Sequence, residues 1–156
     1  MRHTLDYHRT DLIFRLLFSL IFLGLGLEHL FSDETIREMM PAWIAHKRLV
    51  SMAAGVVLLS GGFSVLLGYR TSGGAVVLGA FLLAVTLTVH VPAVFHRPDH
   101  LPHAWHWLWD VYQRSNLVKN LCLLGVCFHL INHEPGKYSL DYRRNHSGKT
   151  SKNFET

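Results

Sequence analysis

Five polar residues in long apolar stretches of this chain have side chains that could bind a ligand or exchange protons. A carboxylate and an imidazole are adjacent near the end of the first stretch, and a second imidazole stands late in the third. An ammonium group and an amide lie near the start of the fourth. Ionisable groups in a membrane are costly and normally face the bundle interior, where they pair. Histidine suits proton exchange because its unperturbed pKa is near neutrality. The five residues are Glu28, His29, His90, Lys119 and Asn120.

Four mostly uncharged stretches must position these residues. Charged residues make up 17% of the chain, whereas about 25% is usual in soluble domains. A helix crosses a bilayer of about 30 Å with about 20 residues. We therefore expect an all-α protein, a bundle of four transmembrane helices in the lipid bilayer. The stretches are residues 12–31, 49–69, 75–95 and 116–132.

The expected membrane domain covers residues 12–133, between a polar leader (1–11) and a polar, basic tail (134–156). Four spans place both termini on one side of the membrane. That side would carry eight basic residues, against five in the two opposite loops. The positive-inside rule thus favours cytoplasmic termini, in what we take to be a bacterial inner membrane. This charge distribution is typical of membrane proteins and gives no evidence for a nucleic-acid partner.

With this topology, the five polar residues come to one level near the outer face. Above it lies a segment rich in tryptophan and histidine, which the sequence places before the fourth helix. Tryptophan favours the headgroup level of a membrane, and Pro98 and Pro102 predict a loop leading into an interfacial helix. Its tryptophans, Trp105, Trp107 and Trp109, are candidates for docking a partner subunit.

Three interpretations of the polar level stay open. A Glu28–Lys119 ion pair with a histidine beside it could hold the helices together, or these groups could reach the headgroups. The same groups could instead form a pocket for a ligand or for protons. A metal or haem is the third, since His29 and His90 come from different helices at similar depth, as two axial ligands require. The loop adds His96, His100, His103 and His106 at spacings of four and three. However, no C-x-x-C-H motif is present and prolines interrupt the loop, which weighs against haem and metal.

A separate acid–base pair begins the first apolar stretch. Asp11 stands four residues before Arg15, and an acid at that spacing before a base can pair with it along a helix. We interpret this as a structural ion pair at the inner face.

Several motifs resemble those of the DoxX-like membrane proteins. Arg15 is followed by LLFSLIFLGLGLEHLF, Pro41 stands in the first loop, and the second apolar stretch contains GVVLLSGGFSVLLGYR. His90 late in the third stretch and the entry to the last helix at residues 116–120 also match. The resemblance covers roughly residues 12 to 133. The Trp/His-rich loop and Lys119 depart from the family pattern.

This resemblance implies a four-helix membrane bundle. The best-known DoxX-like proteins are implied to be subunits of thiosulfate:quinone oxidoreductase, and others accompany redox or stress-defence proteins. It therefore implies a quinone-interacting or accessory subunit of a membrane redox complex, in which His29, His90 and Arg15 match the characteristic polar positions. No soluble-enzyme signature occurs in the sequence, so any catalysis would come from the polar level or from a partner. A non-enzymatic scaffold and a b-type haem protein are the alternatives.

Overall fold

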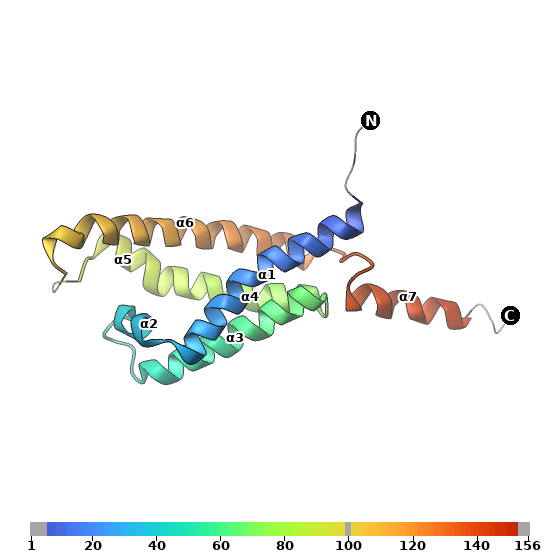
Figure 1. The fold of residues 1–156 in the computed structure, drawn as a ribbon, viewed down its shortest axis with the longest axis horizontal. Helices are drawn as coiled ribbons and strands as arrows, with labels where there is room; N and C mark the ends of the chain where they lie inside the picture. The colour runs from blue at the N-terminus through green and yellow to red at the C-terminus, as the bar shows by residue number, and fades with distance from the viewer. Residues whose placement is uncertain (1–5, 99–100, 153–156) are drawn as a thin grey trace, which may run out of the picture.

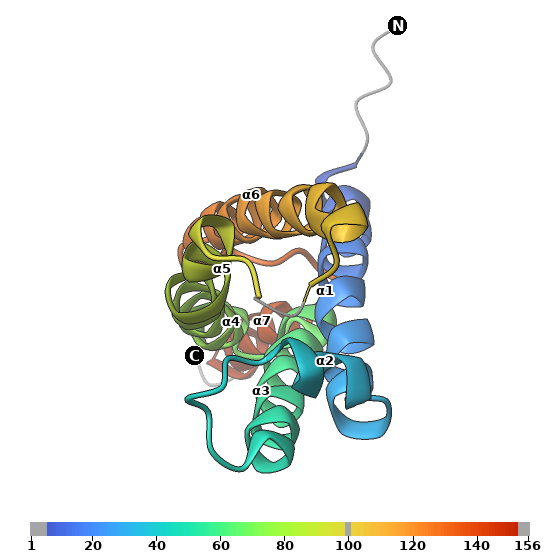
Figure 2. The ribbon, with the colours of Figure 1, turned by 90° about the vertical axis from the view of Figure 1, so that its left-hand side faces the viewer.

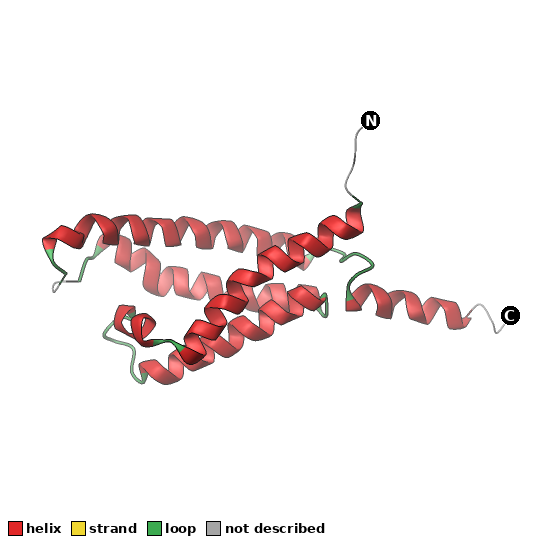
Figure 3. Ribbon diagram, viewed as in Figure 1, coloured by secondary structure: helices red, strands yellow, loops and turns green. Residues whose placement is uncertain are grey.

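The protein is a bundle of helices. The computed structural model describes residues 6–98 and 101–152, and that part of the chain contains helices and no strand (Figure 3). Its four long elements are α1 (Tyr7–Phe31), α3 (Lys47–Leu67), α4 (Thr71–Val85) and α6 (His106–Ile131). The short elements are α2 (Glu34–Met39), the π-helix η1 (Thr86–His90), α5 (Val91–Phe95), the 3₁₀ turn η2 (His103–Trp105) and α7 (Leu140–Lys152).

The long helices are arranged as a ring. In the end-on view of Figure 2, α3 lies beside α1 and α4, and α4 lies beside α6. Successive helices run in opposite directions, so both chain ends lie at one end of the bundle (Figure 1). We call this the termini end, and the opposite end, where α2 lies, the α2 end.

Three of the predicted spans are confirmed by length and composition. Helix α1, helix α3 and the continuous helix Thr71–Phe95 (α4, η1 and α5) are each long and apolar enough to cross a membrane. The chain is therefore an integral membrane protein. Large apolar side chains such as Leu17, Leu20 and Leu83 are exposed on these helices, as expected of surfaces that face lipid rather than water.

The helix predicted as the fourth span is present as α6, with other bounds than expected. Helix α6 has 26 residues, which at 1.5 Å per residue is long enough to cross a membrane. Its composition, however, is not clearly apolar enough for a membrane span. It begins at His106, ten residues before the expected start, so it also contains Asp110 and Arg114. The predicted loop is present, since Pro98 and Pro102 lie between α5 and η2, but no separate interfacial helix follows it: Trp107 and Trp109 stand in the first turns of α6 itself.

Small residues allow α1 and α3 to pack closely. A Cβ atom added at Gly26 would lie 3.2 Å from the backbone oxygen of Gly55, and one at Gly55 would lie 3.0 Å from that of Gly26. Without a hydrophobic driving force between helices in lipid, such close packing is a main source of helix association. The core beside this contact is apolar and contains Phe18, Phe22 and Leu58.

The segment after α6 is anchored to the termini end of the bundle. Asp141, in the first turn of α7, accepts hydrogen bonds from the backbone N–H groups of Arg70 (2.9 Å) and Thr71 (3.0 Å). These N–H groups begin α4 and have no partner within their own helix. Arg70 has a positive φ of 49° and stands in the tight turn between α3 and α4. Asp141 thus caps α4 from a distant part of the chain.

Candidate ligand cavity at the α2 end

A cavity of about 740 Å³ opens between the long helices at the α2 end. Helices α1 and α6 diverge toward this end (Figures 1 and 2). Residues of α2 and of the segment after it also line the cavity. Most of the lining is apolar, including Phe22, Leu25, Met39, Leu58 and Phe81. Cavities of about 300–1,000 Å³ with apolar walls and a few polar groups are typical of small-molecule sites.

All five polar residues singled out from the sequence line this α2-end cavity. Glu28 and His29 come from α1, His90 from η1, and Lys119 and Asn120 from α6. Glu28 is exposed, His29, His90 and Lys119 are half-buried, and Asn120 is buried. Three helices far apart in the sequence therefore bring a carboxylate, two imidazoles, an ammonium group and an amide to one space.

His90 stands at the end of the π-helix. The N–H of Val91 bonds to the carbonyl of Thr86, five residues back, and such π-helical turns are frequent at functional sites. Pro92 supplies a local cause, since its ring lacks an N–H and would clash with the carbonyl four residues earlier in a regular α-helix. The wider turn accommodates the proline within one continuous helix.

Gln113 holds the His90 ring. The Nδ1 atom of His90 lies 3.1 Å from the Oε1 atom of the buried Gln113. A carbonyl oxygen can only accept, so Nδ1 carries the hydrogen and donates it. The neutral imidazole then has its lone pair on Nε2, for which the described part of the chain provides no hydrogen-bond partner.

His29 is held in the same way by Ser51. The Ser51 hydroxyl donates to the backbone oxygen of His29 (3.1 Å), and His29 Nδ1 lies 3.1 Å from the same hydroxyl oxygen. Because the single hydroxyl hydrogen is used, the serine oxygen accepts from Nδ1–H. Nε2 of His29 is again the unprotonated nitrogen. The cavity wall thus contains two oriented imidazoles, each with one nitrogen able to accept a hydrogen bond.

The Glu28–Lys119 ion pair, one of the open interpretations of the sequence, is absent from the described residues. Lys119 Nζ instead donates to the Oδ1 atom of Asn116 at 2.8 Å, on its own helix. Glu28 and Lys119 stand on α1 and α6, which diverge toward this end of the bundle (Figure 1). Nδ2 of Asn116 is buried and has no partner among the described residues. Lys119 and Asn116 therefore provide hydrogen-bond donors.

Asn120 has a contact between helices. Its Nδ2 atom donates to the Oγ1 atom of Thr86 at 3.3 Å, and both residues are buried. This bond ties α6 to the start of η1. Asn120 therefore positions the wall on which His90 stands.

Ion pairs and hydrogen bonds hold α2 to the start of α3, beside the cavity. Asp33, at the start of α2, pairs with Arg37 (3.1 Å) and with Arg48 at the start of α3. Burial of the Asp33 carboxyl opposes its ionisation, but the guanidinium groups of Arg48 and Arg37 outweigh burial and lower the pKa of Asp33 below its ordinary value. Lys47 adds bonds to the backbone oxygens of Arg37 and Met40 at 3.1 and 2.8 Å.

Sequence reasoning did not identify Gln113, Asn116 or Asp33 as parts of the cavity region. A signal existed for two of them. Gln113, Asn116 and Asn120 are spaced three and four apart, which places them on one helix face. This polar face can be recognised in the sequence only when the helix is known to begin at His106 rather than at Asn116.

The termini end has a second polar cluster, around Asp11 and Arg15. Arg15 is fully buried, and its Nε atom lies 3.0 Å from Asp11 Oδ2. The guanidinium also donates to the backbone oxygens of Leu66 (2.7 Å) and Tyr138 (3.2 Å). Asp11 accepts from His133 Nε2 at 2.7 Å and from the Gly136 N–H at 2.9 Å. These bonds join α1 to the end of α3 and to the segment between α6 and α7.

The described histidines of the loop before α6 and the three candidate tryptophans lie between the end of α5 and the first turns of α6. His96 is exposed, the rings of His103 and His106 have centroids 4.5 Å apart, and His100 lies outside the described residues. Within residues 6–98 and 101–152, no group of three or more metal-ligating side chains is placed to hold a metal ion. Trp105 and Trp107 are exposed, whereas Trp109 Nε1 donates to the Ala93 oxygen at 3.1 Å and ties α6 to α5.

The fold and the cavity define a class: a helical membrane protein with a mostly apolar cavity, containing a few polar groups, at one end of its bundle. The DoxX family model matches residues 10–91, and the chain belongs to this family. The match covers α1 to the end of η1, including Glu28, His29 and His90, and ends before α6. No match was found among curated proteins or among solved structures.

Proposed function

We propose that this DoxX-family protein is a quinone-interacting or accessory subunit of a membrane redox complex, and that the α2-end cavity binds the quinone. The observation that carries the proposal is the cavity itself: about 740 Å³, mostly apolar, with two oriented histidines in its wall. A quinone has an apolar body and two polar oxygens. It therefore needs an apolar space with few polar groups, which is the composition of this lining.

The polar groups of the wall suit both redox forms of such a ligand. A quinol has two hydroxyl donors, which the unprotonated Nε2 atoms of His29 and His90 can accept. A quinone has two carbonyl acceptors, for which Lys119 and the partnerless Nδ2 of Asn116 supply donors. Glu28, exposed in the same wall, can exchange protons with the solvent or headgroup side. In this proposal the residues of the wall bind the quinone or quinol and exchange protons with it. The electrons would pass to or from a partner subunit.

In the proposed topology, α6 is the fourth span and both termini are cytoplasmic in a bacterial inner membrane. Helix α6 runs beside α4 along the bundle, which supports a shared membrane depth. The bonds from Asn120 to Thr86 and from Gln113 to His90 satisfy polar groups of α6 inside the bundle, as intramembrane polar residues require. The cavity then lies near the outer face.

The test is turnover of the assembled complex. The protein is purified in mild detergent with its native partners, and quinone-dependent activity is compared between the wild type and His90→Ala. We expect His90→Ala to abolish the activity, with His96→Ala, an exposed histidine outside the cavity, as the matched control. Retained turnover in His90→Ala would refute a direct role of the cavity.

The absorption spectrum of the same sample tests the haem alternative, which requires a Soret band.

A second candidate function, a non-enzymatic scaffold, is favoured by the exposed aromatic residues at the α2 end. Trp107 is 66% exposed, Trp105 is 55% exposed and Phe95 is 77% exposed. Tryptophan is enriched where membrane and protein partners meet. If the protein is a scaffold, its partners co-purify in fixed stoichiometry, and Trp107→Ala loses them. Replacement of Glu28, His29 or His90 then leaves co-purification of the partners unchanged.

A further inference from the structure

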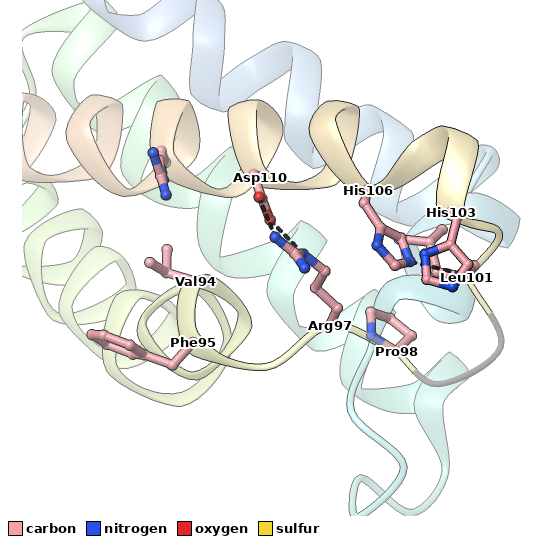
Figure 4. A pocket seen from close by; sticks show the side chains of 9 residues that line it. Val94, Phe95, Arg97, Pro98, Leu101, His103, His106 and Asp110 are labelled. Carbon is pink, nitrogen blue, oxygen red and sulfur yellow. Dashed lines mark hydrogen bonds and ion pairs between the residues drawn. The ribbon is translucent and has the colours of Figure 1, made fainter.

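A second cavity, of about 480 Å³, lies between α5 and the start of α6, and its wall is mainly polar and basic. Figure 4 shows Arg97 reaching from the segment after α5 to Asp110 on α6, with His103 and His106 farther along the same side. Arg114 also lines this α5–α6 cavity. None of these residues takes part in the α2-end cavity. We propose that the α5–α6 cavity binds the phosphate group of an anionic phospholipid.

The walls of this cavity are fixed relative to each other. Arg97 Nε and Nη2 donate to the two carboxylate oxygens of Asp110 at 2.9 and 2.6 Å, a bidentate pair. The pairing raises the pKa of Arg97 above its ordinary value. Trp109 adds its bond to the Ala93 oxygen of α5. A site preorganised by such contacts loses less free energy on ligand binding than a mobile one.

The charge of the cavity favours an anion. Among the described residues, two arginines and one aspartate line it, so one positive charge remains uncompensated with neutral histidines. Arg97 uses two of its nitrogens on Asp110, which leaves Nη1. Within the described residues, Arg114 has no ion-pair partner at 4.0 Å or less. Arginine is the side chain best suited to bidentate binding of phosphate.

The position of the cavity favours a lipid over free phosphate. It lies where the membrane-spanning helix Thr71–Phe95 ends, which is the level of lipid headgroups. Val94 and Phe95 belong to its lining, and Phe95 is 77% exposed. One part of the wall can thus contact an acyl chain while the arginines contact the phosphate. A zwitterionic lipid would place a positive ammonium group near two arginines, which would repel it. An anionic headgroup such as phosphatidylglycerol is therefore preferred.

Native mass spectrometry of the detergent-purified protein tests this proposal. Phosphatidylglycerol and phosphatidylcholine of equal chain length are titrated separately, and their dissociation constants are compared. Arg114→Gln should weaken phosphatidylglycerol binding about three- to fivefold, the range expected for one partly exposed charge. Asp110→Asn should strengthen it by a similar factor, because it removes the competing carboxylate and releases Arg97, while the bond of Trp109 to the Ala93 oxygen still holds α6 to α5. A gain in affinity cannot result from misfolding.

Arg144→Gln is the matched control, because it removes the same charge from the exposed face of α7. It should leave the dissociation constant unchanged. An inorganic phosphate titration distinguishes the two sources of the ligand. Phosphate that binds as tightly as phosphatidylglycerol would overturn the lipid assignment. Equal binding of both lipids by the wild type, or changes of the same sign in both cavity variants, would overturn the site.

Discussion

Nδ1 of His90 lies 3.1 Å from Oε1 of Gln113, so a buried amide on α6 sets the orientation of an imidazole on η1. The bond crosses between two helices and defines which ring nitrogen carries the hydrogen. An imidazole held in this way is ready to accept a hydrogen bond through Nε2. The proposed binding of a quinol depends on this arrangement.

Gln113→Leu should weaken binding of a short-chain quinol to the purified protein about fivefold. The His90 ring then loses its acceptor, and a neutral hydrogen bond of this kind contributes about 1 kcal/mol. Gln113→Glu, which retains an acceptor for Nδ1, should bind more tightly than Gln113→Leu. Equal affinities in the two variants would show that the orientation of His90 has no part in binding.

Asp11→Ala should be among the most destabilising single changes in the protein. It leaves the fully buried Arg15 without its carboxylate, and breaking a buried ion pair costs about 3–5 kcal/mol. The free energy of unfolding in detergent measures the loss. The double variant Asp11→Ala/Arg15→Met should recover part of it, because no unpaired charge remains. A double variant less stable than the single one would contradict this.

Asp141→Ala should release α7 from the bundle. Losing a helix cap costs about 0.5–2 kcal/mol, here through the N–H groups of Arg70 and Thr71. We expect faster proteolytic cleavage between α6 and α7, with a small decrease in thermal stability. Glu134→Ala removes the same charge from an exposed side chain in that segment and should be cleaved at the wild-type rate.

The contact of Asp33 with Arg37 and Arg48 should depend on pH. The pKa of Asp33 is lowered in the folded protein, whereas an unfolded aspartate has a pKa of about 3.9. The stabilisation is therefore present above about pH 4 and is lost as the pH falls through the lower, folded pKa. Hydrogen exchange of α2 measures this. At pH 6, Asp33→Asn should exchange faster than the wild type, and the difference should shrink toward pH 3; a difference independent of pH would contradict the assignment.

The sequence predicts much of this architecture because apolar length and alternating direction determine the depth of each residue in a bundle. Glu28, His29, His90, Lys119 and Asn120 lie in three apolar stretches, and the three helices that contain them line one cavity. Depth does not determine rotation about the helix axis or the distance between helices. For that reason the sequence suggested a Glu28–Lys119 pair, whereas Lys119 bonds to Asn116.

The polar partners were harder to predict than the polar residues themselves. Ser51 and Gln113 are ordinary residues in the sequence, and their role comes from the helix that faces them. The start of α6 was also misplaced, because hydropathy detects the apolar part of a helix and not its polar first turns. Asp141 caps a helix 70 residues away, a contact with no local signal.

The most direct test of the central claim is equilibrium binding of a short-chain benzoquinone and its quinol to the purified wild type, His29→Ala, His90→Ala and His96→Ala. We predict saturable quinol binding that is about tenfold weaker in His29→Ala and in His90→Ala, since about 1.4 kcal/mol of hydrogen bonding corresponds to tenfold. His96→Ala should bind like the wild type. The same dissociation constant in all four proteins, or no saturable binding to the wild type, would contradict the assignment of the α2-end cavity as a quinone site.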